Sequence, residues 1–232
     1  LSVDKLFPND ATNKQLTLEY TQNPVWLQLN TLPTMASENA TNALQVVTSY
    51  YANNKMINLL QSVPNIDMVL QVWRDEALKN KQLNSSLAQN DDLKLSSLFE
   101  TPWVSVAEKE DEQTKNILRK DLISQLVSRK EADFQKLQTL QYANGAFSWF
   151  PNMPSSAYIT SVVLEKMAIL FAQEKQSPAL HRLLNKALQF MEKEVKNEGE
   201  SIKKQQTKGV KSVFVSDMAM RYLYAKTLLQ NE

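Results

Sequence analysis

The sequence predicts an all-α fold built of helical hairpins. Apolar residues recur at helical spacing along most of the 232 residues, and short polar links separate the apolar segments. Glycine occurs only three times, against an average share of about 7% in proteins, which disfavours folds with many tight turns. The content of 43% hydrophobic residues is sufficient for a sizeable core in a chain of this length.

The first 33 residues predict an extended connector. Residues 16–21 (LTLEYT) alternate weakly between apolar and polar side chains, and Asn23-Pro24 interrupts the chain before Trp26. We therefore expect the helical domain to span residues 34–232.

Four helical segments are expected in the first part of this domain. Apolar side chains at helical spacing predict a helix from Glu38 to Leu60. Pro64 ends that helix, and Asn65 can cap the next one. A short helical piece over residues 93–99 and a long helix that stops at Asn144-Gly145 follow.

Three further helices are expected in the second part. After the aromatic loop AFSWFPNMP, Ser155 or Ser156 can cap one helix, and another runs from Pro178 to about Asn197 as its antiparallel partner. A basic link precedes a last helix from Val213 to Leu229. The total is about seven helices, whose lengths and order fit stacked hairpins better than a four-helix bundle.

Composition excludes several classes of function. The 26 basic and 25 acidic residues are interspersed, so no strong field attracts nucleic acid or an anionic membrane. No apolar run approaches the roughly 20 residues that cross a bilayer, so we expect no membrane insertion of this segment. The absence of cysteine excludes disulfides and thiol nucleophiles. The start at Leu1 rather than Met suggests a piece of a longer protein.

Other polar and aromatic residues give weak signals. The acidic residues Glu108, Glu110, Asp111 and Glu112, like Asp91-Asp92, are more simply explained as solvated surface than as a cation site. His181, the only histidine, has no Ser and Asp arrangement beside it that would suggest a catalytic triad. The aromatic loop is expected to plug the end of a helical layer. We therefore assign no catalytic residue, no metal and no cofactor.

Four stretches occur in an order that resembles one known family. They are LTLEYTQNPVWLQLNTLP (16–33), SYYAN (49–53), FETPWVSVAEKE (99–110) and NGAFSWFPN (144–152). Together they resemble the complement-like, thioester-containing domain of bacterial alpha-2-macroglobulin-like proteins. The resemblance implies an α/α toroid made of helical hairpins, of which this chain would supply a part.

The reactive motif of that family, Cys-x-Glu-Gln, is lost. Counting back from SYYAN places the motif on Asn42-Ala43-Leu44-Gln45, so Asn42 stands at the Cys position and Leu44 at the Glu position. Gln45 is retained, but without the thiol no internal thioester can form. The side-chain amides of Asn42 and Gln45, one helical turn apart, can hydrogen-bond to each other instead.

The resemblance implies a non-catalytic domain of a large periplasmic or cell-envelope protein that traps proteases or acts in defence, without covalent capture. Its partners would be other domains of the same chain and proteases. An α/α-toroid enzyme acting on carbohydrates or terpenoids, and a plain helical scaffold for protein docking, stay open as alternatives.

Seven helices are too few to close a toroid, which leaves an edge at the last helix. We therefore expect part of an apolar face on this helix to be exposed or covered by a second copy, with either self-association through this end or a lower stability than that of the complete domain. The residues of that face are Met218, Tyr222, Leu223 and Leu228.

Overall fold

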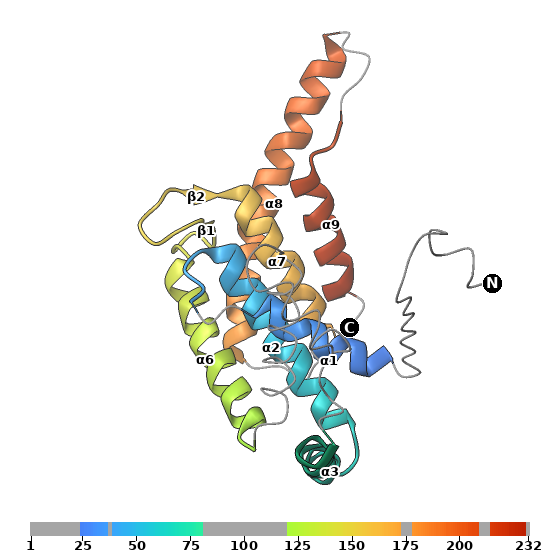
Figure 1. Ribbon diagram of the computed structural model, residues 1–232. Helices are drawn as coiled ribbons and strands as arrows, with labels where there is room; N and C mark the ends of the chain where they lie inside the picture. The colour runs from blue at the N-terminus through green and yellow to red at the C-terminus, as the bar shows by residue number, and fades with distance from the viewer. Residues whose placement is uncertain (1–23, 37–38, 81–119, 173–177, 209–213, 231–232) are drawn as a thin grey trace, which may run out of the picture.

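The structure, a computed structural model, describes residues 24–36, 39–80, 120–172, 178–208 and 214–230. These residues are mostly helical, which confirms the prediction of an all-α fold (Figure 1). The helices are α1 (Pro24–Met35), α2 (Ala43–Ser62), α3 (Ile66–Asn80), α6 (Leu122–Leu140), α7 (Ala157–Phe171), α8 (Pro178–Thr207) and α9 (Asp217–Gln230). Two short strands, β1 (Phe147–Ser148) and β2 (Ser155–Ser156), pair antiparallel.

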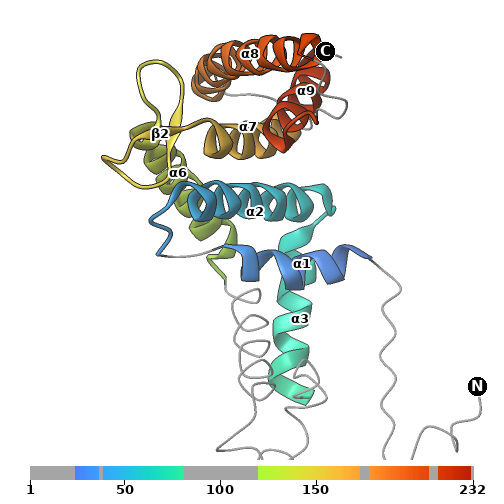
Figure 2. The ribbon, with the colours of Figure 1, turned by 90° about the horizontal axis from the view of Figure 1, so that it is seen from above.

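Helices α2, α7 and α9 form a central layer, with α7 in contact with both of the others. Helix α6 packs against α2, and α8 packs against α7 and α9. Seen from above, α8, α7, α2 and α1 follow one another across the molecule (Figure 2). Because neighbours cover α2 and α7 on several sides, each leaves only a narrow stripe of side chains partly exposed.

Two hydrophobic clusters hold the layers together. The larger cluster joins the central layer to α6 and α8 through fully buried residues such as Val47, Leu137, Met167, Leu184 and Ala225. The smaller cluster joins α1, α2, α3 and α6, and its members are Leu29, Leu32, Ala52, Met56, Ile57, Leu60, Leu70, Leu122 and Leu126. Helices α2 and α6 both contribute to the two clusters, so this pair connects the two parts of the core.

Helix α1 corrects the expectation of an extended connector up to residue 33. Residues 24–35 are helical, whereas residues 1–23 lie outside the described part. Pro24 opens the helix, where a missing amide hydrogen costs nothing. Leu29 and Leu32, three residues apart on one face, are buried against α2. The polar break at Asn23-Pro24 therefore begins a helix instead of separating two extended segments.

Most other helices differ from the expectations at their ends. Helix α2 begins at Ala43, and α6 ends at Leu140, before Asn144-Gly145. Helix α8 continues ten residues past the predicted end at Asn197, because one glycine, Gly199, costs only about 1 kcal/mol in a helix of good helix formers. The predictions of a helix after Pro64-Asn65 and of the Ser156 cap are confirmed. The piece expected over residues 93–99 lies outside the described residues.

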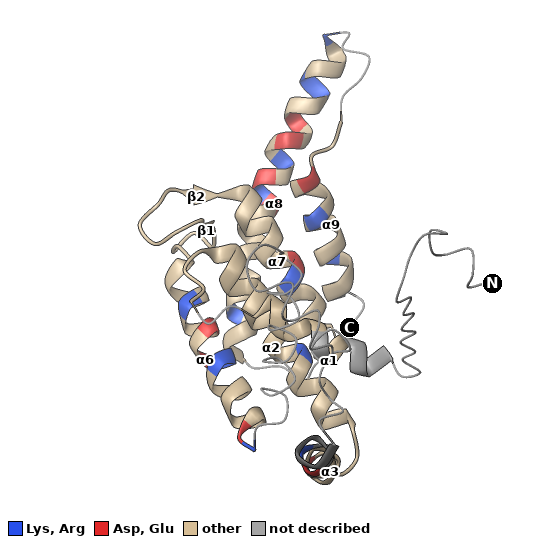
Figure 3. Ribbon diagram, viewed as in Figure 1, with Lys and Arg blue, Asp and Glu red and all other residues tan. Residues whose placement is uncertain are grey.

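The second half of α8 projects beyond the other helices (Figure 1). The buried residues of α8 all lie in its first half, from Leu180 to Met191, and both acidic and basic residues lie along the projecting part (Figure 3). Glu198 holds the returning chain, since its two carboxylate oxygens accept hydrogen bonds from Ser216 N and Ser216 Oγ, each at 2.7 Å. None of the described helices has the length and apolar content to cross a membrane.

The apolar edge at α9 is confirmed only in part. Tyr222 is buried, and Met218 and Leu228 pack against the larger cluster. Leu223 is 48% exposed, and Met220 and Tyr224 of the same helix are exposed as well.

Candidate functional site

The start of α2, where the reactive motif of the resembled family would lie, is a helix cap. Asn42 has an extended backbone, with φ −104° and ψ 157°, and its side-chain oxygen accepts a hydrogen bond from Gln45 N at 2.9 Å. The Gln45 side chain turns back, and its Oε1 accepts from Thr41 N at 3.4 Å. This arrangement resembles a capping box, except that Gln45 accepts from the amide of Thr41, one residue before the N-cap, and not from the amide of Asn42 itself.

The cap shows that one expected hydrogen bond is wrong, and it explains why Asn42 and Gln45 suit their positions. Asn42 and Gln45 each bond to the backbone, so the expected hydrogen bond between their two side-chain amides is wrong. An asparagine is among the best residues at a helix N-cap, because its side chain reaches the third residue of the helix. Leu44 is partly buried and packs against the larger hydrophobic cluster. Asn42, Leu44 and Gln45 therefore all serve the local structure.

The aromatic loop lies directly beside this helix start. The amide of Ala43 donates a hydrogen bond to the carbonyl oxygen of Trp149 at 2.9 Å. Gly145 has a φ of +90°, and a side chain there would overlap the backbone of Lys186 in α8. The hydroxyl of Tyr142 closes the loop by donating to the carbonyl oxygen of Met153 at 2.6 Å. The loop therefore ties α2, α6 and α8 together at one end of the molecule.

Only one aromatic residue of the loop fulfils the expected role as a plug. Phe147 is fully buried, and its amide donates to Thr160 Oγ1 at 2.8 Å. Trp149 and Phe150 are about 40% exposed, and so are Tyr142 and Met153. We call these four exposed residues the aromatic patch. Aromatic and methionine side chains on a surface are typical of places where another polypeptide docks.

A buried polar cluster between α2 and α6 was missed by sequence reasoning. Ser49 Oγ donates to Asp133 Oδ2 at 2.6 Å, and Asn53 Nδ2 donates to the same oxygen at 3.2 Å. All three side chains are buried, and burial raises the pKa of the Asp133 carboxyl, against the effect of the Ser49 hydrogen bond and of Lys136. Ser49 and Asn53 are four residues apart in SYYAN, and that spacing in an apolar helix is the signal that could have revealed the cluster.

A second feature without a sequence signal is a face of tyrosines and cations on the central layer. The ring of Tyr51 in α2 lies 5.7 Å from Lys55 Nζ and 5.5 Å from Lys166 Nζ of α7. Arg221 of α9 lies 5.2 Å from the ring of Tyr158, and its Nε is 3.3 Å from a carboxylate oxygen of Glu165. These pairs join three helices that are far apart in the sequence, so only the fold brings them together.

The acidic residues and the histidine that the sequence offers as candidates form no recognisable site in the described part of the chain. The acidic residues at 108–112 and Asp91-Asp92 lie outside the described part of the chain. His181 is exposed on α8, and its ring lies 5.6 Å from that of Phe171. Within the described residues, no group of three His, Cys, Asp or Glu side chains is placed to hold a metal ion.

The start of α2 thus offers hydrogen bonds and exposed aromatic surface, and it contains no cysteine. Comparison of the chain with models of protein families, with curated proteins and with solved structures finds no match.

Proposed function

We propose that this chain is a non-catalytic helical domain of a large alpha-2-macroglobulin-like protein of the bacterial periplasm or cell envelope. In this proposal the domain belongs to a partial α/α toroid and takes part in protease trapping or defence without forming a covalent bond. Its partners are the other domains of the same protein and the captured protease.

The observation that carries the proposal is the capped start of α2. Asn42 occupies the position that requires a cysteine for thioester chemistry, and its side chain is engaged in a 2.9 Å hydrogen bond to Gln45 N. The sequence resemblance supports the family, and the cap supports a scaffold that persists without the reaction. The helical pairing of α7 with α8 and of α8 with α9 is compatible with a toroid made of hairpins.

The test uses the full-length protein that contains this chain and a protease of broad specificity. After incubation, the mixture is separated by native size exclusion and by denaturing electrophoresis. We expect the protease to co-elute with the protein under native conditions and to separate completely after denaturation. A complex that survives denaturation, or failure to co-elute, contradicts the proposal.

A plain docking scaffold is the second candidate, and the aromatic patch favours it. If the patch contacts the protease, replacing both Trp149 and Phe150 by alanine should abolish co-elution, while the backbone bond from Ala43 N to Trp149 O is kept. Co-elution that persists in this double variant argues against the patch as the contact surface.

Turnover of an oligosaccharide or an allylic diphosphate by the chain would instead support the enzyme alternative.

A further inference from the structure

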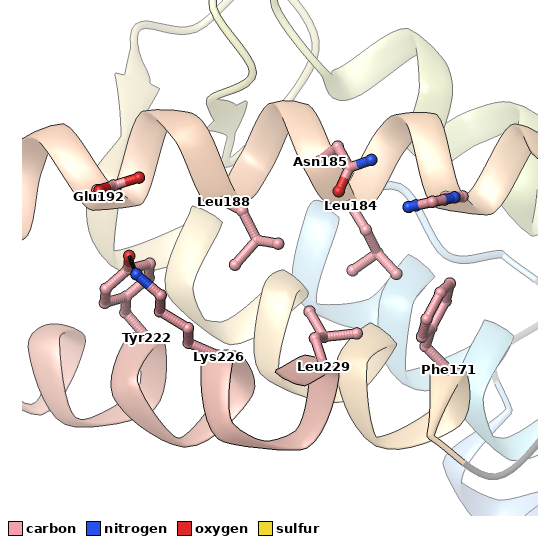
Figure 4. A pocket seen from close by; sticks show the side chains of 9 residues that line it. Phe171, Leu184, Asn185, Leu188, Glu192, Tyr222, Lys226 and Leu229 are labelled. Carbon is pink, nitrogen blue, oxygen red and sulfur yellow. Dashed lines mark hydrogen bonds between the residues drawn. The ribbon is translucent and has the colours of Figure 1, made fainter. Parts of the chain in front are cut away.

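A pocket of about 230 Å³ opens between α8 and α9, next to the end of α7. The type of side chain that lines the pocket changes from one end to the other (Figure 4). Charged and hydroxyl groups lie at one end, leucines line the middle, and an aromatic ring lies at the other end. Pockets for drug-sized ligands measure roughly 300–1,000 Å³, so this pocket suits a smaller molecule.

The polar end of the pocket presents two opposite charges. Lys226 Nζ donates a hydrogen bond to the hydroxyl of Tyr222 at 3.3 Å, and this bond raises the pKa of Lys226. Across the pocket, Glu192 pairs with Lys196 at 3.0 Å, which lowers the pKa of the Glu192 carboxyl. Both groups are therefore charged at neutral pH. A ligand that carries both an anionic and a cationic group can satisfy them together.

Leucines line the middle of the pocket, with Asn185 beside Leu184 (Figure 4). Leu184 is buried, and Leu188 and Leu229 are partly buried against the larger cluster, with their methyl groups directed into the pocket (Figure 4). The ring of Phe171, in contact with His181, lies at the far end. A short apolar side chain placed along the leucines would remove these groups from water.

We propose that this pocket binds a free apolar α-amino acid, with leucine and phenylalanine as the simplest examples. The ligand carboxylate pairs with Lys226, the ligand ammonium pairs with Glu192, and the side chain lies on Leu188 and Leu229. A ligand with a single charge engages only one of these two side chains, and the ligand ammonium shares Glu192 with Lys196. Binding of an amino acid in this pocket is separate from the proposed function and does not depend on it.

His181 supplies a direct measurement. It is the only histidine in the chain and lines the pocket, so its ring protons give isolated ¹H NMR signals that report on binding. Titration of the chain with L-leucine or L-phenylalanine at constant pH should shift these signals saturably, with a dissociation constant of about 1–10 mM for so small a ligand. Glycine, leucinamide and 4-methylpentanoate, which lack the side chain, the carboxylate and the ammonium, should each bind at least about fivefold more weakly.

Two charge variants complete the test. Lys226→Met and Glu192→Gln should each weaken leucine binding about fivefold, since one ion pair at an exposed site is lost. Lys193→Met, which removes an exposed charge on α8 outside the pocket, should leave the affinity unchanged. Thermal unfolding of each variant verifies that the fold is kept. The absence of a saturable shift, equal binding of 4-methylpentanoate, or unchanged affinity in both charge variants would overturn the proposal.

Discussion

At the scale of single residues, the cap at the start of α2 gives the first prediction. Asn42→Ala should lower the free energy of unfolding by about 1 kcal/mol, because Gln45 N loses its acceptor. Asn42→Ser and Asn42→Asp should recover most of the loss, since both side chains can cap a helix. Urea unfolding measures the change, with the exposed Gln138→Ala in α6 as the control. Equal stability of the Ala and Ser variants would show that the cap contributes nothing.

Asp133 gives a prediction of pH dependence. Burial is the largest cause of its raised pKa, so the folded state favours the protonated carboxyl. The stability contributed by this group is therefore full below its unfolded pKa of about 3.9, and it is lost as the pH rises through the higher folded value. Asp133→Asn keeps an acceptor for Ser49 and Asn53. It also adds a donor for Asn53 Oδ1, which has no hydrogen-bond partner among the described residues.

We expect Asp133→Asn to be more stable than the natural chain by about 1 kcal/mol at pH 7, with the difference shrinking toward pH 4. Urea unfolding between pH 4 and pH 8 measures both variants. Asp133→Ala should be less stable at every pH, because it leaves a cavity and removes the shared acceptor of Ser49 and Asn53. A difference between the Asp and Asn forms that grows toward acidic pH would contradict this account.

At the scale of elements, two glycines make a matched pair. Gly145 has a φ of +90° and lies against the backbone of Lys186, so Gly145→Ala should cost about 2–4 kcal/mol through strain and displacement of α8. Gly199 lies inside α8 with nothing within 4 Å of an added Cβ, so Gly199→Ala should stabilise the chain by about 0.5–1 kcal/mol. The midpoint temperatures of thermal unfolding of the two variants should shift in opposite directions from that of the natural chain. Midpoint shifts of the same sign would contradict the structure.

The elements also show what the sequence could predict. Helical spacing placed α2, α6 and α7 correctly, because their apolar residues are buried at that spacing. It also predicted α3, although Met68 and Val72 of that helix are exposed and Leu70 is the residue that packs into the smaller cluster. Helical spacing failed to predict α1, because its few apolar residues show no clear helical period. It also misplaced the end of α8, because no run of apolar residues at helical spacing marks where a solvated helix ends.

At the site, counting from SYYAN assigned Asn42 and Gln45 to a lost reactive motif, and their part in a helix cap was not predicted, because the helix was expected to begin at Glu38. The Asp133 cluster and the tyrosine face depend on which helices become neighbours, and local spacing carries no such information.

At the scale of the whole molecule, the exposed side of α9 predicts self-association. Met220, Leu223 and Tyr224 are about half exposed and lie on one side of the helix, at spacings of three and four residues. Light scattering over a concentration series should give an average molar mass that rises above that of the 26.5 kDa monomer as the protein concentration increases. Leu223→Ala should weaken this association several-fold by removing apolar contact area, whereas Gln138→Ala, exposed on α6, should change it little. A monomer at every concentration would mean that this surface has no partner in a second copy.

The central proposal is that this domain has the scaffold of the thioester family without its reaction, with a structural cap at the start of α2, and Asn42→Cys tests it most directly. The natural chain has no cysteine, so every thiol measured in this variant comes from residue 42. We predict one thiol per chain that reacts at once with a thiol reagent, and an intact mass that methylamine leaves unchanged, because Leu44 and the first turn of α2 are packed as a cap. A thiol that becomes reactive only after methylamine treatment, with methylamine attached at Gln45, would contradict the account.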